Sequence, residues 1–288
     1  MVRQRPQLFS VATIAWLVGL LAVEGFAQTP ESTQRAERGA LAALEAYMET
    51  WNTRKPEVWA TSLHFPHVRP SARPFRLSRS PDEFTSTVNF ERTVATGWHR
   101  SQWDSFRVLH VSESKVHVAG QYTRYAREST PIFTALVTYV VTKKDGRWGT
   151  QARFGAGRMG LTTEERDANA AAAEDAVAAY VDAMNDPTNV DGWADTMHYP
   201  QVRIARGTLQ QWETDVSFKA GSEPGRLRTW FRTRLVSFDA VQVGQDAVNA
   251  AVQYSLENLD GESLATHDAV FLVTRRDGIW KIQARSSM

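Results

Sequence analysis

Thr-Lys-Lys-Asp-Gly-Arg-Trp occupies residues 142–148 and is followed by Gln-Ala-Arg at 151–153. The same pattern returns as Thr-Arg-Arg-Asp-Gly-Ile-Trp at 274–280, followed by Gln-Ala-Arg at 283–285, a step of 274 − 142 = 132 residues. Earlier landmarks keep nearly the same step: Tyr47 and Tyr180, Asn52 and Asn185, Trp59 and Trp193, His64-Phe65-Pro66 and His198-Tyr199-Pro200. Solenoid repeats run at about 20 to 50 residues, so this period predicts a tandem duplication of a whole domain.

The chain divides into three parts by composition. Arg3 and Arg5, an apolar run over 8–23 and Gly-Phe-Ala at 25–27 are typical of a secretory signal peptide over 1–27. The rival interpretation is an uncleaved membrane anchor, but the run is shorter than the ~20 residues that a spanning helix needs. Cleavage would start the mature chain at Gln28 and place it in the periplasm or outside the cell, with no membrane partner. A glycine-rich segment over 155–160 predicts the linker, which gives domains over 28–158 and 159–288.

Composition excludes several classes of function. The formal net charge of +1 gives no strong field toward nucleic acid, so no nucleic-acid partner is expected. The absence of cysteine removes disulfides, thiolate metal sites and cysteine nucleophiles. No metal site is expected either, because no His-x-x-x-His pair or carboxylate run accompanies His64 and His67. Phosphate-binding glycine loops and Gly-x-Ser-x-Gly elbows are missing, and we expect no cofactor.

Periodicity predicts the same order of elements in each copy. Apolar residues at helical spacing predict a helix over 30–51, a second over 56–63 follows, and Thr162 with Glu165 predicts a capping box at the start of the second copy. After a short extended segment and a third helical segment, the pattern predicts strands over 103–111, 116–125, 132–142 and 147–153, with Asp145-Gly146 as a hairpin turn. The predicted fold class is α+β, with helices on one face of a curved antiparallel sheet.

This order, the Tyr47-x-x-x-x-Asn52 pattern and the closing Asp-Gly-x-Trp hairpin resemble the nuclear transport factor 2-like superfamily, whose members include ketosteroid isomerase and SnoaL-like polyketide cyclases. The resemblance implies a cone, in which a bent sheet wraps around helices and encloses a largely apolar cavity. It also implies pairing through the outer sheet face, so that the two copies would form a pseudo-dimer within a monomeric chain.

The strand over 132–142 supports such pairing independently. Both of its faces are mostly apolar, since Phe133, Ala135, Val137, Tyr139 and Val141 alternate with Thr134, Leu136, Thr138 and Val140. The strand's counterpart near Val270 and Leu272 shows a similar pattern. A strand that is apolar on both sides needs cover on both sides, and the other copy can supply the second cover.

The resemblance to ketosteroid isomerase implies a tyrosine, an aspartate base and a second acid. Tyr47 and Tyr180 match the tyrosine, but the base position falls near Ser71 and Ala205, and the second acid near Thr138 and Val270. That chemistry is therefore not expected. Asp268 shares a strand face with Val270 and is the acid nearest to the required place.

Other repeated residues leave two interpretations open. His64 and His198 are general bases or, as we favour, residues that cap a helix end and pack on an aromatic ring. Arg69 and Arg203 bind an acidic ligand group or form ion pairs at the rim. Trp51, Trp98 and Trp230 line a pocket or pack in the core. Arg153 and Arg285 are expected to cover the end of the sheet.

These observations favour an exported tandem protein that binds a small, mostly apolar molecule in a cone cavity. The ligand-binding residues would be Tyr47, Trp51, His64, Arg69, Trp98, Arg203 and Trp230. One alternative is a cofactor-independent isomerase, dehydratase or cyclase that uses Tyr180, His198 and Asp268, or else Tyr47, His64 and His67, converging on one void. Another is a non-catalytic scaffold or interaction module whose cavities are filled by its own aromatic side chains.

Overall fold

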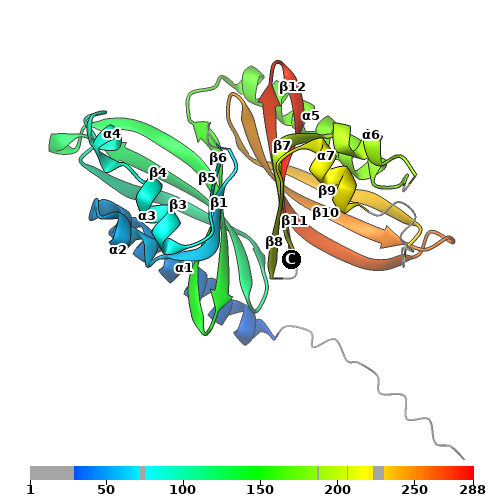
Figure 1. The fold of residues 1–288 in the computed structure, drawn as a ribbon, viewed down its shortest axis with the longest axis horizontal. Helices are drawn as coiled ribbons and strands as arrows, with labels where there is room; N and C mark the ends of the chain where they lie inside the picture. Colours follow the sequence, from blue (N-terminus) through cyan, green and yellow to red (C-terminus); the bar gives the residue numbers. More distant parts are fainter. Residues whose placement is uncertain (1–28, 72–74, 187, 206, 223–229) are drawn as a thin grey trace, which may run out of the picture.

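The structure is a computed structural model that describes residues 29–71, 75–186, 188–205, 207–222 and 230–288 (Figure 1). The predicted signal peptide and Gln28 lie outside the described residues. Within the described ranges, no helix has the length and apolar character needed to cross a membrane.

The first half contains the elements drawn from blue to green in Figure 1. They are α1 (Pro30–Asn52), α2 (Pro56–Ala60), β1 (Leu63–Arg69), β2 (Arg76–Ser78), α3 (Pro81–Thr87), α4 (Phe90–Val94), β3 (Arg100–Val111), β4 (Lys115–Tyr125), a 3₁₀ turn (Arg127–Ser129), β5 (Pro131–Lys144) and β6 (Arg147–Arg158). The third helical segment of the prediction is thus two short helices, α3 and α4.

The second half repeats the plan. It consists of α5 (Thr163–Ala183), α6 (Val190–Asp195), β7 (Met197–Ala205), β8 (Thr208–Trp212), α7 (Asp215–Gly221), β9 (Arg232–Val243), β10 (Ala247–Glu257), β11 (Ser263–Arg276) and β12 (Ile279–Ser287). The two six-stranded sheets have the orders β2-β1-β6-β5-β4-β3 and β8-β7-β12-β11-β10-β9, which correspond strand for strand. The predicted α+β fold with two similar halves is confirmed.

The sheets are mixed, and the prediction of a purely antiparallel sheet was wrong. β1 pairs parallel with β6, and β7 pairs parallel with β12. A parallel pair needs a long crossover, and the chain between β1 and β6 supplies one because it forms two helices and four further strands before returning. Periodicity could not reveal this, since parallel and antiparallel strands alternate their side chains alike.

Each long helix begins and packs as its sequence predicts. α1 starts at Pro30 after the N-cap Thr29, and it buries Ala40, Leu44 and Tyr47 against β3, β4, β5 and β6. At α5 the capping box is confirmed, because Thr162 and Glu165 each bind the other's main-chain N–H. Each helix thereby covers one face of its own sheet and leaves the opposite face of the sheet to be covered from elsewhere.

The opposite faces of the two sheets meet at the centre of the molecule (Figure 1), and we call this contact the seam. Its apolar core combines both halves and contains Val68, Val140, Ala152, Phe154, Val202, Ile204, Ala247, Val270, Leu272 and Ala284. Arg107 and Asp239, which are 132 residues apart, form an ion pair of 2.6 Å across it. Contacts between equivalent positions are expected near a two-fold axis. The predicted pseudo-dimer, with each copy covering the second face of the other's strands, is confirmed.

Candidate functional site

Three tyrosines from three elements meet inside the first sheet. Tyr47 on α1, Tyr122 on β4 and Tyr139 on β5 are all buried. The ring centroids of Tyr47 and Tyr139 are 5.6 Å apart. Helical spacing on α1 and alternation on the strands point these side chains inward, because their neighbours Leu44, Val118 and Val137 belong to the same core.

Three arginines join the tyrosines. Arg153 on β6 donates from Nη2 to the Tyr122 hydroxyl at 3.0 Å. Arg69 on β1 lies with its guanidinium carbon 5.5 Å from the Trp59 ring centre, and that of Arg124 on β4 lies 5.2 Å from the Trp51 ring centre. The Nε atom of each arginine is buried without a hydrogen-bond partner. Aromatic rings therefore hold these cations in place while leaving donor atoms free.

No carboxylate neutralises this cluster in the described part of the chain. The ion pairs found there involve neither Arg69 nor Arg124 nor Arg153. A buried cation without a counterion is costly, and proteins normally pair it. The rim ion pair that was one interpretation of Arg69 is therefore not formed, and the cluster carries a local excess of positive charge.

Burial and the arginine charges shift the ionisation of the cluster. Burial and the neighbouring charge of Arg153 lower the pKa of Arg69 to about 10. Burial by itself would raise the pKa of Tyr122, but the charges of Arg153 and Arg124 outweigh it and lower the pKa below its usual value. Burial raises the pKa of Tyr47 and holds that of Tyr139 well above the usual value. The electrostatic potential here thus favours a negative charge, most strongly at the Tyr122 oxygen.

The cavity at this cluster is small. It is lined by Tyr47, Met48, Trp51, Ser101, Tyr122, Arg124, Tyr139 and Arg153, and the centre of a water-sized sphere can move through about 10 Å³ of it. A volume of that size holds about one water molecule. Without side-chain movement the cavity therefore accommodates only a few atoms, such as a carboxylate group. The rest of a larger ligand must lie outside the cavity, toward solvent.

The second cone keeps only part of this arrangement. The guanidinium carbon of Arg285, the counterpart of Arg153, lies 5.7–5.9 Å from the ring centres of Tyr180, Tyr254 and Phe271. Phe271 and Leu256 stand where the first copy has Tyr139 and Arg124, at the same step of 132 residues. The second cone thus lacks one hydroxyl and one cation, and the first cone is the stronger candidate site.

The structure does not bring together the proposed catalytic residues Tyr180, His198 and Asp268. Tyr180 lies in the core of the second cone. His198 Nδ1 is 3.0 Å from the Thr274 hydroxyl, and Asp268 accepts a hydrogen bond from Gln253. Thr274 and Asp268 alternate with the core residue Phe271, so they lie on the other face of the sheet. The first-copy alternative fails likewise, because His64 Nδ1 contacts Thr142 on the outer face.

The proposed ligand-binding residues also lie in different parts of the structure. Tyr47, Trp51 and Arg69 belong to the arginine–tyrosine cluster, and Arg203 occupies the equivalent place on β7. His64 lies on the outer face. Trp98 is 2% exposed and packs behind the cluster, with its ring centre 5.2 Å from that of Trp51, and it donates to Ser101 at 2.9 Å. Trp230, in the second half, donates to Thr233 at 3.1 Å.

The sequence analysis missed Tyr122, Tyr139 and Arg124 and misplaced Arg153 and Arg285. The last two point into the cones instead of covering the sheet ends, because Ala152 and Ala284 beside them face the seam. A signal was present in the alternation of β6, where an arginine stands between the apolar residues Ala152 and Phe154. The sequence did not show which face of the sheet is concave and therefore encloses these side chains.

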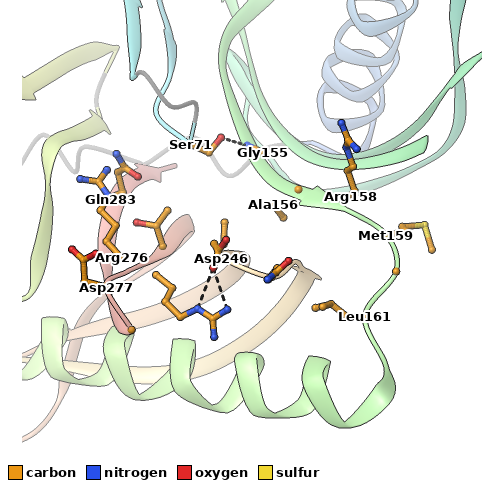
Figure 2. A pocket seen from close by; sticks show the side chains of 17 residues that line it. Ser71, Gly155, Ala156, Arg158, Met159, Leu161, Asp246, Arg276, Asp277 and Gln283 are labelled. Carbon is orange, nitrogen blue, oxygen red and sulfur yellow. Dashed lines mark hydrogen bonds and ion pairs between the residues drawn. The ribbon is translucent and has the colours of Figure 1, made fainter. Parts of the chain in front are cut away.

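A larger cleft lies at the seam, near the connection from β6 to α5 (Figure 2). The glycine-rich segment predicted as a linker over 155–160 is not wholly a linker, because β6 continues to Arg158. It has a volume of about 730 Å³, with Ser71 and Ala156 on one side and Arg276, Asp277 and Gln283 on the other. Its size suits a small molecule. Its three arginines are already engaged, however. Arg275 pairs with Asp246 at 3.1 Å, Arg276 donates to the Tyr199 carbonyl at 2.6 Å, and the guanidinium carbon of Arg158 lies 4.2 Å from the Phe133 ring centre. The cleft therefore offers less to a ligand than the first cone. Across the described ranges, no three His, Asp or Glu side chains gather as a metal site would require.

Comparison with known proteins yields similarity of fold. No protein-family model and no curated protein sequence matches the chain. Among solved structures, a protein with a cystatin-like fold from Nostoc punctiforme is 14% identical, with a TM-score of 0.36, over 45% of this chain and 93% of its own. An NTF2-like protein from Shewanella oneidensis is 14% identical, with a TM-score of 0.32, over 41% and 96%. An NTF2-like protein with a cystatin-like fold from Novosphingobium aromaticivorans is 12% identical, with a TM-score of 0.36, over 42% and 80%. Each match covers less than half of this chain, and two of the three proteins are described as NTF2-like.

Proposed function

We propose that this is an exported binding protein whose first cone holds a small, mostly apolar molecule by an acidic group. The observation that supports this is the buried set of Arg69, Arg124 and Arg153, which the described residues leave without a carboxylate. An anionic ligand would supply the missing counterion and accept hydrogen bonds from the free Nε donors.

The geometry suggests how such a ligand would lie. Its acid group would occupy the small cavity that Tyr122 and Arg153 help to line, and its apolar part would extend over the Trp51 ring toward solvent. Aromatic walls with a few convergent polar groups are the usual design of a small-molecule site. The second cone, with Leu256 and Phe271 in place of Arg124 and Tyr139, would serve mainly as the structural partner.

A matched pair of variants tests the proposal. Binding of benzoate and hexanoate, with benzamide and hexanamide as uncharged controls, would be followed by calorimetry and by tryptophan fluorescence. We expect the acids to bind and the amides to bind at least about tenfold more weakly, since charged hydrogen bonds contribute about 1.5–3 kcal/mol. Arg153→Met should abolish the preference, and Arg285→Met, the same change in the second cone, should preserve it.

The proposal fails if acids and amides bind alike, or if only Arg285→Met affects binding. Native mass spectrometry of the purified protein gives an independent measurement, because a tightly held organic acid would co-purify and would be lost in Arg153→Met. A clean mass, with none of the acids bound, would instead favour the scaffold interpretation.

One observation favours catalysis as a second candidate function. The lowered pKa of Tyr122 increases the fraction of phenolate beside the cavity, and a phenolate can accept a proton from a bound ligand. Exchange of ligand protons for deuterium in D₂O, followed by NMR, would reveal this activity. It should vanish in Tyr122→Phe while the acid still binds, and exchange at an unchanged rate would remove Tyr122 from the role.

A further inference from the structure

The two sides of the seam carry different polar pairs at equivalent positions. Gln242 on β9 and Asn249 on β10 correspond to His110 on β3 and His117 on β4, each at the repeat step of 132 residues. One side of the pseudo-two-fold thus holds two amides, and the other holds two imidazoles. Only the imidazoles can change charge between neutral and mildly acidic pH.

The amide pair joins the halves by hydrogen bonds that do not depend on pH. Gln242 donates to the Gly120 carbonyl at 2.9 Å and accepts from the Thr138 hydroxyl at 3.0 Å. Asn249 donates to the Phe154 carbonyl at 2.7 Å and to Gln242 at 2.9 Å. Both residues come from the second half, and Gly120, Thr138 and Phe154 come from the first.

The histidine pair joins the halves through the end of β12. His110 Nδ1 and His117 Nδ1 are 3.1 Å apart, and His117 Nε2 is 2.8 Å from the Ser286 hydroxyl. Beside them, Lys115 donates from Nζ to the Ser287 carbonyl at 2.6 Å. His117 is 0% exposed, so water cannot replace any of these bonds without movement of the strands.

Two charged side chains act on the pair, and one ion pair holds the seam close to it. Lys115 lies on the same strand as His117, and its charge adds to the effects of burial and of His110 in keeping the His117 pKa well below its usual value. Asp268 on β11 faces His110 and opposes the lowering of the His110 pKa by burial. The ion pair of Arg107 and Asp239 is exposed, so solvent screens it. As the pH falls, His110 therefore takes up a proton before His117 does. Protonation of His117 is then opposed by burial and by the positive charges of Lys115 and of protonated His110.

Whether the two rings can stay in contact depends on how many hydrogens lie between their Nδ1 atoms. In the neutral pair one Nδ1 donates and the other accepts, and a proton added to His110 leaves this bond in place. A proton added to His117 as well places two N–H groups against each other at a separation of 3.1 Å. Two like charges without an acceptor between them are strongly disfavoured in a buried site.

We propose that the seam is an acid-sensitive hinge, in which protonation of both His110 and His117 parts β4 from the end of β12 while Gln242 and Asn249 keep the other side closed. Opening would expose Ser286, Ser287 and the buried face of β4. The pseudo-dimer would then be tight at neutral pH and loose on one side in acid.

Distance measurements between the halves test this proposal. The chain contains no cysteine, so Glu45→Cys on α1 and Glu174→Cys on α5, both exposed, carry the only two spin labels. Double electron–electron resonance at pH 7.5 and 4.5 then reports the separation of the halves. The control is H110Q/H117N, which places the second copy's own amide pair in the first copy and leaves His64 and His67 unchanged.

We expect a longer-distance population at pH 4.5 in the protein with the histidine pair. The ratio of the long-distance to the short-distance population should rise at least about tenfold between pH 7.5 and pH 4.5. A histidine whose pKa is one unit lower in the closed seam than in the open seam shifts the equilibrium between the two states tenfold. In H110Q/H117N the distances should not depend on pH. If the double variant does not fold, H117N by itself removes the second proton and should also suppress the long distance. Equal responses in both proteins, no response in either, or loss of circular dichroism in both alike at pH 4.5 would overturn the proposal.

Discussion

Lowering the pH from 7 to 5 should reduce the free energy of unfolding by about 2 kcal/mol through His67 by itself. His67 is 2% exposed, and its Nδ1 lies 3.1 Å from the Thr150 carbonyl, to which it can donate. Its Nε2 is buried without a partner among the described residues. Burial, followed by the charge of Arg69, lowers the pKa of His67 to about 3.

The direction follows from proton binding in the two states. An unfolded histidine with a pKa of about 6.5 binds a proton below that pH, and the folded protein refuses it until about pH 3. The contribution of His67 to the free energy of unfolding is therefore fully present above pH 6.5. It falls by about 1.4 kcal/mol per pH unit below that pH and stops falling near pH 3. Between pH 7 and pH 5 this amounts to about 2 kcal/mol.

The assay is urea unfolding followed by tryptophan fluorescence at pH 7 and pH 5. His67→Asn keeps a donor for Thr150 but does not titrate, so its loss of stability between the two pH values should be smaller than that of the unmodified protein by about 2 kcal/mol. His99→Asn, at an exposed position, is the control and should retain the full pH dependence. If His67→Asn loses as much stability as His99→Asn, the reasoning from burial is refuted.

Three further changes test the seam and the cluster. Phe154→Ala empties a fully buried position in the seam and should cost about 3–5 kcal/mol in urea unfolding; a loss below about 1 kcal/mol would mean that the seam contributes little. Gly244→Ala would place a Cβ against the Ala156 carbonyl oxygen, so it should cost about 3 kcal/mol of stability and lower the melting temperature; an unchanged melting temperature would contradict this contact. Tyr122→Phe should remove from the absorbance titration at 295 nm a tyrosine that ionises below the usual pKa of about 10 because Arg153 is beside it; identical titration curves would refute the assigned shift.

The sequence by itself determined the duplication and most of the local structure. The Asp-Gly turns have the positive φ angles that a tight hairpin requires, with Asp145 at 50° and Gly146 at 78°, and Asp277 and Gly278 match them. The repeat, the capping box at Thr162 and the doubly apolar β5 were readable because they depend on neighbours within a few residues or on alternation along one strand. The same strand also predicted the seam, since a second apolar face demands a second cover.

Only the tertiary structure decided where the chemistry lies. Alternation places Arg153 and Ala152 on opposite faces, but it does not say which face is concave, so the arginine was assigned to the sheet end and Asp268 to a cone. Tyr47, Arg69 and Tyr122 lie on three elements separated by long stretches of chain, and they meet only after β1 has paired with β6. The histidine pair was likewise invisible, because two rings acquire a shared function only when a strand from the other half closes over them.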